Sequence, residues 1–245
     1  MPHFFIKSDD VINNKVTISD KETFNHLAKS LRIRKGEKLL LIDENQIQYE
    51  TVVENITSRD ILANIEKSYK SQRKLLFKLY LAQSPLRSDA QNFVIEKATE
   101  LGVDGVYPTY TDNCALATSV IEKKIPKWQR IMLEASKQCE RAYIPTCFEL
   151  TKLENIINLQ NNGYKVIAFC ERCTDLSLFD YTQKNPINID DKLVVIIGPE
   201  GGFSQKEFDL FREHNIPMLT HGELILKDDT AVTVELVNIK VSYTQ

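Results

Sequence analysis

The chain has 245 residues, 42% of them hydrophobic, and a formal net charge of −3 at pH 7. This length allows one large domain, or a small domain followed by a medium one, each with a real hydrophobic core. The weakly acidic balance excludes a protein that coats nucleic acid by overall positive charge. No stretch approaches the roughly 20 apolar residues of a membrane span, and the start lacks an export signal, so we expect a cytoplasmic protein.

The five cysteines lie between Cys114 and Cys173, and their number is odd. Without an export signal they are expected to be reduced thiols rather than a disulfide framework. Only Cys170 and Cys173 have the spacing of a zinc-binding or redox pair. Because no second pair follows and the histidines are distant in sequence, free thiols are favoured and no metal is expected.

The first 70 residues have the composition of short strands, predicted at 4–6, 15–18, 38–43, 46–53 and 61–66. One helix interrupts them. Residues 19–22 have capping-box spacing, Phe24, Leu27, Ala28 and Leu31 then share a helical face, and the helix is expected to end before Gly36. Residues 1–70 are therefore predicted to form a small β-barrel, with the basic stretch 67–74 as the linker out of it.

Residues 71–245 alternate apolar runs with amphipathic segments. The runs at 75–81, 165–169 and 193–197 are typical of strands in a parallel sheet whose two faces are both covered. One predicted helix carries the stripe Ala90, Phe93, Val94, Ala98 and Leu101 and ends at Gly102, and another carries Trp128, Ile131, Ala135 and Cys139. This part is therefore predicted to be an α/β domain with a parallel sheet.

A glycine-rich loop follows the last of these apolar runs. Residues 198–203 read Gly-Pro-Glu-Gly-Gly-Phe, and Ser204 with Glu207 forms a second capping box that starts a helix. Ligands of α/β sheets bind at the carboxyl ends of strands, and absent side chains would let a flat ligand approach the backbone. A plain strand-to-helix turn is the alternative, whereas phosphate-loop and dinucleotide patterns do not match.

The closing segment, residues 219–231, places Gly222 in an apolar stretch before a terminal helix. Asp228 or Asp229 is the expected cap of this helix, which should run to about Val241. The loop could deliver Lys227 and Asp229 to the strand ends as charged catalytic groups, or these residues could be a solvated helix entry. The basic runs at 32–38, 67–74 and 122–130 likewise suit either a limited RNA-binding face or solvated surface.

Five segments, in this order, resemble one known family, the SPOUT-class uridine-N3 methyltransferases of small-subunit ribosomal RNA, often called methyltransferase E. The segments are residues 26–37, residues 96–103, a helix with Trp128, Arg130, Glu134, Gln138 and Arg141, the loop 197–204, and residues 225–231. The resemblance covers nearly the whole chain. It implies a PUA-like, RNA-binding β-barrel in residues 1–70 and a trefoil-knotted parallel-sheet methyltransferase domain in residues 71–245.

The resemblance also implies a cofactor, S-adenosyl-L-methionine, and a homodimer with its active site at the interface. The implied substrate is small-subunit ribosomal RNA or the assembled small subunit. The implied cofactor-binding residues are Ile197, Gly198, Glu200, Gly201, Gly202, Leu219, Gly222, Leu224, Ile225 and Leu226, and the implied RNA-binding residues are His26, Arg32, Arg34 and Lys35.

For catalysis we expect Arg141, Lys227 and Asp229. The cations, with Arg32 as a further one, would stabilise negative charge on the uracil, and Asp229 or Glu200 would orient them or act as base. Leu224 and Lys227 stand where the family usually has arginine. Because neither can make a bidentate guanidinium contact, two alternative functions stay open. These are a noncatalytic RNA-binding protein that keeps the knotted fold, and a SPOUT methyltransferase for another rRNA or tRNA nucleotide.

Overall fold

A computed structural model describes residues 3–71, 76–170, 176–220, 222 and 226–243, without the side chain of Ser88. The chain folds into two compact units. The first holds Met1–Arg73 together with Ser136–Tyr143, and the second holds Lys74–Ala135 and Ile144–Gln245.

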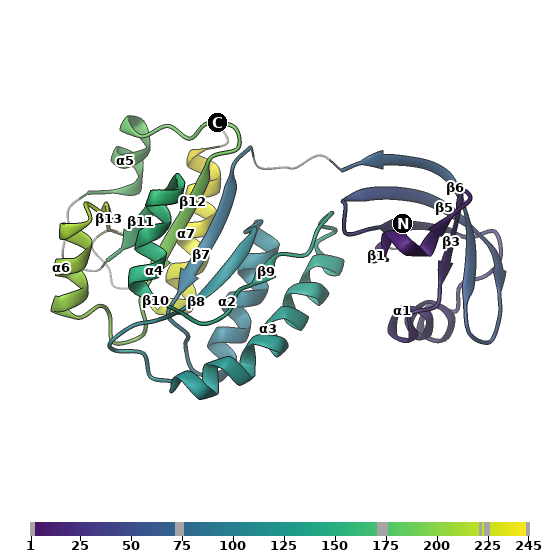
Figure 1. The fold of residues 1–245 in the computed structure, drawn as a ribbon, viewed down its shortest axis with the longest axis horizontal. Coiled ribbons are helices and arrows are strands. Elements are labelled where there is room, and N and C mark those ends of the chain that lie inside the picture. The colour runs from purple at the N-terminus through teal and green to yellow at the C-terminus, as the bar shows by residue number, and fades with distance from the viewer. Residues whose placement is uncertain (1–2, 72–75, 171–175, 221, 223–225, 244–245) are drawn as a thin grey trace. The chain divides into compact units, whose positions relative to one another are not determined.

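The first unit is built on a six-stranded mixed sheet with the order β1-β4-β5-β6-β3-β2 (Figure 1). β1 pairs with β4 in parallel, and the other neighbours are antiparallel. The strands are β1 (His3–Phe5), β2 (Val11–Ile12), β3 (Lys15–Ile18), β4 (Lys38–Ile42), β5 (Ile47–Ile56) and β6 (Ile61–Lys70). Inward side chains of these strands and of α1 (Lys21–Asn25) gather in a single core around Leu27, Leu39 and Leu41, as in a small barrel.

Two local predictions for this unit are wrong. The cap of α1 is Asp20 rather than Ser19, because the Asp20 carboxylate accepts a hydrogen bond of 2.8 Å from the Thr23 backbone N–H. The basic stretch that begins at Lys67 is not wholly a linker, since β6 continues to Lys70 and pairs there with Ile47 of β5.

The second unit contains a seven-stranded parallel sheet (Figure 1). Six strands have the order β10-β8-β7-β12-β11-β13, and the seventh, β9, pairs with β8. Its strands are β7 (Lys78–Gln83), β8 (Gly105–Tyr110), β9 (Thr146–Cys147), β10 (Thr151–Lys152), β11 (Tyr164–Phe169), β12 (Lys192–Ile197) and β13 (Met218–Leu219). Its helices are α2 (Ser88–Leu101), α3 (Thr118–Gln138), α4 (Leu153–Ile157), α5 (Leu178–Lys184), α6 (Gln205–Glu213) and α7 (Asp228–Ser242).

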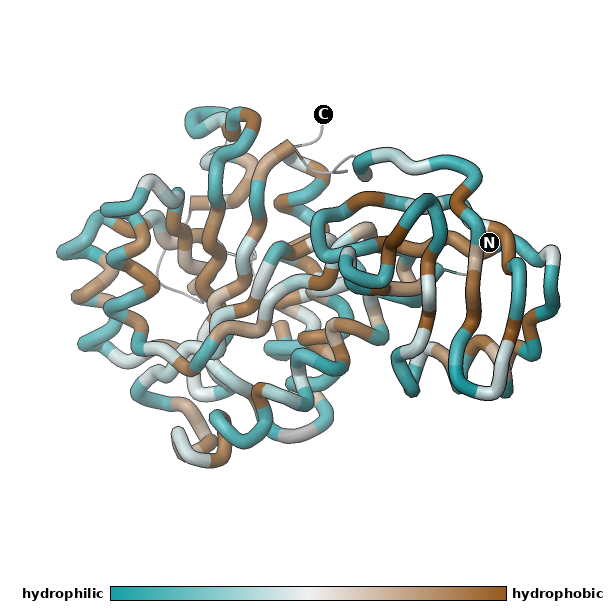
Figure 2. The backbone as a smooth tube through the Cα atoms, turned by 45° about the vertical axis from the view of Figure 1, so that its right-hand side comes forward, coloured by the Kyte–Doolittle hydropathy of each residue, from teal (hydrophilic) through white to brown (hydrophobic). Residues whose placement is uncertain are grey.

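Helices cover both faces of this sheet. The apolar residues of α2, α3 and α7 pack on one face, against Leu79, Leu81 and Val195. Those of α4 and α6 pack on the other face, against Val194 and Ile196. Coverage on both sides explains why the strands are hydrophobic at successive positions (Figure 2).

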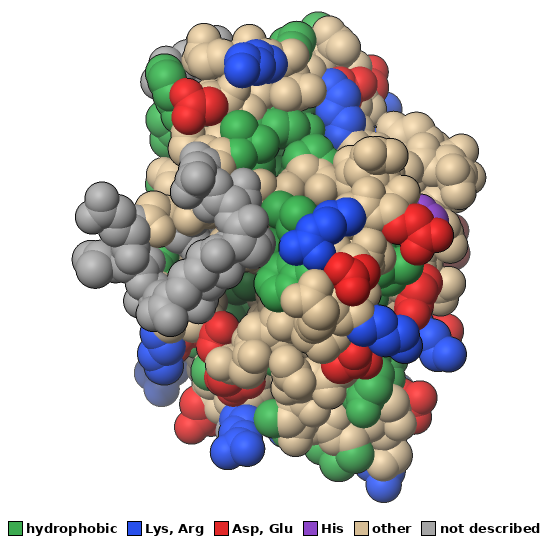
Figure 3. Space-filling model, turned by 90° about the vertical axis from the view of Figure 1, so that its left-hand side faces the viewer, with side chains coloured by type: hydrophobic (Ala, Val, Ile, Leu, Met, Phe, Trp, Pro, Cys, Tyr) green, Lys and Arg blue, Asp and Glu red, His purple; other side chains and the backbone are tan. Residues whose placement is uncertain are grey.

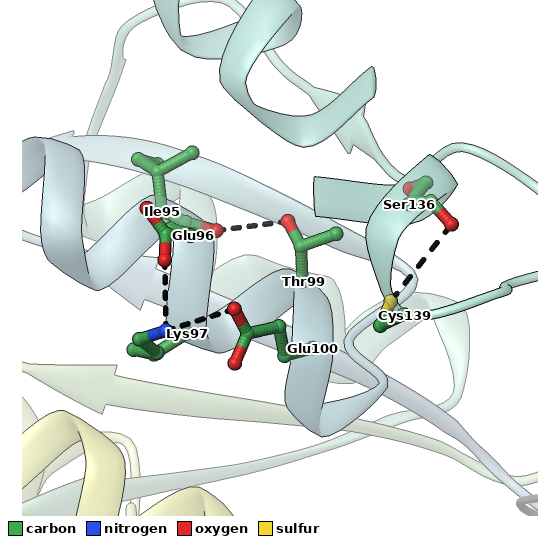
Figure 4. A network of polar contacts seen from close by, with 7 residues as sticks. All are labelled: Ile95, Glu96, Lys97, Thr99, Glu100, Ser136 and Cys139. Atoms are coloured by element: carbon green, nitrogen blue, oxygen red, sulfur yellow. Dashed lines mark hydrogen bonds and ion pairs between the residues drawn. The ribbon is translucent and has the colours of Figure 1, made fainter. Parts of the chain in front are cut away.

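The two helices predicted from apolar stripes are present, with corrections. α2 ends at Gly102, whose φ of 101° is the left-handed conformation of a helix C-cap. Phe93, placed in the apolar stripe, is instead exposed, with the Lys97 ammonium 5.7 Å from its ring centroid. Lys97 also pairs with Glu96 and Glu100 along the same helix (Figure 4). α3 begins at Thr118, well before Trp128, and contains Pro126.

As predicted, a β domain precedes an α/β domain with a parallel sheet. The first strand of that sheet was placed too early, because Leu76 is exposed and β7 runs from Lys78 to Gln83, while Leu75 lies outside the described residues. None of the helices described in the structure is long and apolar enough to cross a membrane.

Candidate functional site

The carboxyl ends of β11, β12 and β13 bring two predicted cofactor segments to one edge of the sheet. In the strand register Phe169 of β11 pairs with Ile197 on one side and with Leu219 on the other. The loops that follow Ile197 and Leu219 therefore leave from the same level. This edge is where ligands bind in open α/β sheets.

Two glycines of the loop that follows Ile197 have close neighbours where a side chain would start. A Cβ on Gly198 would lie 3.3 Å from the Phe203 ring, and a Cβ on Gly201 would lie 3.1 Å from the Cβ of Asn113. Gly202 has a φ of +67°, a conformation that favours glycine. Close neighbours thus favour glycine at positions 198 and 201, and backbone conformation favours it at position 202.

Side-chain amides from two other strand exits hold the carbonyls of this loop. Gln83, at the end of β7, donates from Nε2 to the carbonyl of Gly198 at 3.0 Å. Asn113, which follows β8, donates from Nδ2 to the carbonyls of Gly201 and Gly202 at 3.2 and 3.0 Å. Both contacts tie the loop to residues that are remote in sequence.

The predicted capping box of α6 is present and extends to the neighbouring loop. The Ser204 hydroxyl accepts from the Glu207 N–H at 3.2 Å, and the Glu207 carboxylate accepts from the Ser204 N–H at 2.8 Å. The second oxygen of the buried Glu207 carboxylate accepts from the Asp112 N–H at 2.9 Å. The Ser204 hydroxyl also donates to the Asp112 carboxylate at 2.6 Å, so the end of the glycine loop is fixed to the exit of β8.

The second predicted cofactor segment is described in part. Leu219 is fully buried at the end of β13, and Gly222 has a φ of +113°. The Gly222 N–H donates to the Thr220 hydroxyl at 3.1 Å, which closes a tight turn. Leu226 is half-buried, and Leu224 and Ile225 lie outside the described residues.

Two of the three predicted catalytic residues form an ion pair at the start of α7. The Lys227 ammonium lies 2.6 Å from the Asp229 carboxylate. The hydrogen bond between them raises the pKa of Lys227 and lowers that of Asp229. The expected aspartate cap is wrong: Lys227 occupies the cap position, its side chain accepts no hydrogen bond from a backbone N–H of the first turn, and Asp228 and Asp229 lie in that turn.

The third catalytic candidate and the predicted RNA-binding residues belong to the first unit. Arg141, the third catalytic candidate, has its guanidinium 4.3 Å from the ring centroid of Tyr143. His26 is exposed at the start of a π-helical turn (His26–Ser30).

The basic turn after it is exposed as well. Buried Ile33, whose N–H donates to the Leu27 carbonyl, anchors it, while Arg32, Arg34 and Lys35 stay at the surface.

The face of the second unit that carries α5 and α6 is not a basic surface, since acidic and basic side chains lie interspersed on it around a hydrophobic area (Figure 3). A cavity of about 410 Å³ opens between the ends of β8 and β10 and helix α6. Lys152 and Lys206 line it, outnumbered by the carboxyl groups of Asp112, Glu154, Glu207, Asp209 and Glu213. This excess of carboxylates makes the cavity a poor site for phosphate.

Sequence reasoning missed Gln83 and Asn113. Gln83 was detectable as the polar residue that ends an apolar strand, although nothing local indicated its partner. Asn113 meets the glycine loop only in the tertiary structure, because 88 residues separate it from Gly201.

Comparison with known proteins agrees with this arrangement. A sequence model of the RNA methyltransferase domain matches residues 73–240, and one of the RNA methyltransferase PUA domain matches residues 18–66. The chain is thus an RNA methyltransferase by fold and sequence. It is 31% identical over 214 residues to the ribosomal RNA small subunit methyltransferase E of Mesomycoplasma hyopneumoniae, covering 85% of this chain and 87% of that protein. The chain belongs to the ribosomal RNA small subunit methyltransferase E family, as the sequence resemblance predicted.

Solved structures show the same fold. The ribosomal RNA small subunit methyltransferase E from Neisseria gonorrhoeae, bound to S-adenosyl methionine, superimposes with a TM-score of 0.84 at 20% identity, over 99% of this chain and 98% of the other. A Legionella pneumophila protein in complex with the same cofactor has a TM-score of 0.83 at 23% identity, with the same coverage.

Proposed function

We propose that the chain methylates a uridine of small-subunit ribosomal RNA at N3, using S-adenosyl-L-methionine. The observation that carries the proposal is the glycine loop after Ile197. In this chain, which belongs to the family, the loop lies at the carboxyl edge of the parallel sheet, with glycine where neighbours are close or φ is positive. Two further findings support the proposed activity: the names of the relatives, and the S-adenosylmethionine bound in two structural neighbours.

The described residues fit such a cofactor. Gly198, Gly201 and Gly202 give the loop main-chain groups without side chains of their own, so a flat ligand can approach these groups closely. We assign its binding to Ile197, Gly198, Glu200, Gly201, Gly202, Leu219, Gly222 and Leu226, together with Leu224 and Ile225. When bound, the cofactor supplies an activated methyl group.

The charged groups at the start of α7 are suited to the remaining chemistry. A cation near the uracil carbonyls would stabilise the negative charge that develops as N3 loses its proton, and we assign this role to Lys227, with Arg141 as a second cation. Asp229 is better suited to holding Lys227 than to accepting the proton. Its pKa is lowered by the ion pair, which makes it a weaker base.

We assign RNA binding to the PUA-like part, residues 1–70, and catalysis to residues 71–245. The exposed His26, Arg32, Arg34 and Lys35 are available for phosphate contacts. Binding of this kind would hold the RNA while the target uridine, which must be unpaired to expose N3, enters the catalytic site.

We also propose that the protein is a homodimer with a trefoil knot in its catalytic domain and that it acts in the cytoplasm, where small subunits are assembled. The character of α7 supports a dimer. Two of its apolar side chains, Val237 and Val241, are 38% and 50% exposed. A partner subunit that covers this part of α7 would explain the exposed valines.

The test is methyl transfer to small subunits purified from a strain that lacks this protein, followed by mass spectrometry of the rRNA nucleosides. We expect N3-methyluridine to appear only when protein and cofactor are both present. Another methylated nucleoside would indicate a different target. Cofactor and RNA binding without any methylated product would indicate the noncatalytic alternative.

A further inference from the structure

Gln83 is a polar residue that lies fully buried, next to the hydrophobic core of the second unit. It follows Leu79 and Leu81 on the same face of β7, and all three side chains are fully buried. A third apolar residue would pack there without the cost of burying an amide group. We therefore look to the hydrogen bonds of the Gln83 amide group, rather than to its packing, for its role.

The contacts of Gln83 indicate what it provides. Its Nε2 donates to the Gly198 carbonyl at 3.0 Å and to the Ser84 carbonyl at 2.8 Å. Because both neighbours are acceptors, only the NH₂ end of the amide can face them. The other end, Oε1, has no hydrogen-bond partner among the described residues.

Further hydrogen bonds join the strand exits around this amide. The Ser84 N–H donates to the Ile197 carbonyl at 3.1 Å, directly before the glycine loop. The Ser84 and Thr111 hydroxyls, both buried, lie 2.7 Å apart and connect the exits of β7 and β8. Gln83 and Ser84 thus belong to a set of hydrogen bonds that joins the exits of β7, β8 and β12.

We propose that Gln83 is a positioning residue for the cofactor. Its buried amide group fixes the Gly198 carbonyl and so holds the glycine loop in the conformation that binds S-adenosyl-L-methionine. This inference rests on the proposed function, and it gives a role to a residue that does not belong to the loop itself.

The first experiment measures cofactor affinity by calorimetry for wild type, Gln83→Met and a control. Methionine matches the length of glutamine but cannot donate, so affinity should fall roughly tenfold or more, because two carbonyls lose their donor. Gln129→Met is the matched control. Gln129 also bridges two segments through its amide, with Nε2 to Pro145 at 3.0 Å and Oε1 to the Cys147 N–H at 2.8 Å, but these segments do not include the loop.

A second variant separates positioning from a general loss of stability. In Gln83→Glu a protonated carboxyl can still donate to Gly198, whereas the carboxylate cannot. Its affinity relative to wild type should therefore fall as the pH rises from about 5 to about 8, because burial raises the pKa of the new carboxyl. Gln129→Glu should show no such trend.

The outcomes are distinct. Loss of cofactor binding in Gln83→Met with a folded protein, or the pH trend in Gln83→Glu, supports the proposal. If wild type binds the cofactor and both Gln83 variants bind it within about twofold at every pH, the positioning role is wrong and the proposed function stands. If wild type itself does not bind, both are overturned.

Discussion

Replacing Gly201 by valine should weaken cofactor binding through a steric conflict with Asn113. The ideal Cβ at Gly201 lies 3.1 Å from the Asn113 Cβ and 3.7 Å from its Cγ, and the two valine methyl groups extend further. Gly201 is not among the residues with positive φ, so the backbone itself accepts a side chain there. The effect should come from the displacement of Asn113.

The magnitude follows from the contacts that this displacement breaks. Asn113 donates to the Gly201 and Gly202 carbonyls at 3.2 and 3.0 Å. Each such hydrogen bond contributes about 0.5–1.5 kcal/mol net, so losing both removes roughly 1–3 kcal/mol from the ordered loop. If the loop must be ordered to bind, the Kd for S-adenosyl-L-methionine should rise roughly fivefold to 150-fold.

Calorimetric titration of wild type and Gly201→Val with S-adenosyl-L-methionine measures this change. Gly163→Ala is a suitable control, because Gly163 has a φ of +77° in a turn before β11 with nothing within 4 Å of its ideal Cβ. It should lower stability through backbone strain and leave the Kd unchanged. An unchanged Kd in folded Gly201→Val would show that the glycine loop is not the cofactor site.

Three further predictions concern catalysis, RNA binding and stability. Lys227→Ala should lower the single-turnover methylation rate roughly tenfold to a thousandfold with little change in cofactor affinity, and Lys227→Arg should retain activity. Replacing Arg32, Arg34 and Lys35 together by alanine should weaken RNA binding and reduce its salt slope by up to about 2, while sparing cofactor binding. Burial raises the pKa of Cys147 to about 12, so with rising pH the thiol ionises in the unfolded protein before it does in the folded one. This lowers the free energy of unfolding of wild type between about pH 9 and 12, and the decrease should be smaller in Cys147→Ala, which lacks the thiol.

Each of these has a contrary result. Equal methylation rates for wild type and Lys227→Ala, both above background, would show that Lys227 does not stabilise the transition state. An unchanged salt slope in the triple variant would make the basic turn ordinary solvated surface. Parallel pH profiles of unfolding by urea for wild type and Cys147→Ala would mean that the thiol is not shielded in the folded protein.

The pattern of apolar residues predicted the division into a β part and an α/β part, with some of the strands of each. Continuous apolar runs predicted the buried parallel strands β11 and β12, because a strand covered on both faces needs hydrophobic side chains at every position. The Ser204 capping box and the Gly102 end of α2 were also predictable, since they depend on hydrogen bonds and dihedral angles within a few residues. β8 was not predicted, because Pro108 interrupts its pattern.

The hydrogen bonds that hold the glycine loop depend on the tertiary structure. The strand order places the exits of β7, β8 and β12 side by side, and only then can Gln83 and Asn113 donate to carbonyls that are 115 and 88 residues away. The pairing of Lys227 with Asp229 is local, yet its pKa consequences depend on rotamers that the sequence does not specify. Local signals specify elements and glycine positions because they act through neighbouring residues, whereas the contacts that hold the loop depend on the packing of strands distant in sequence.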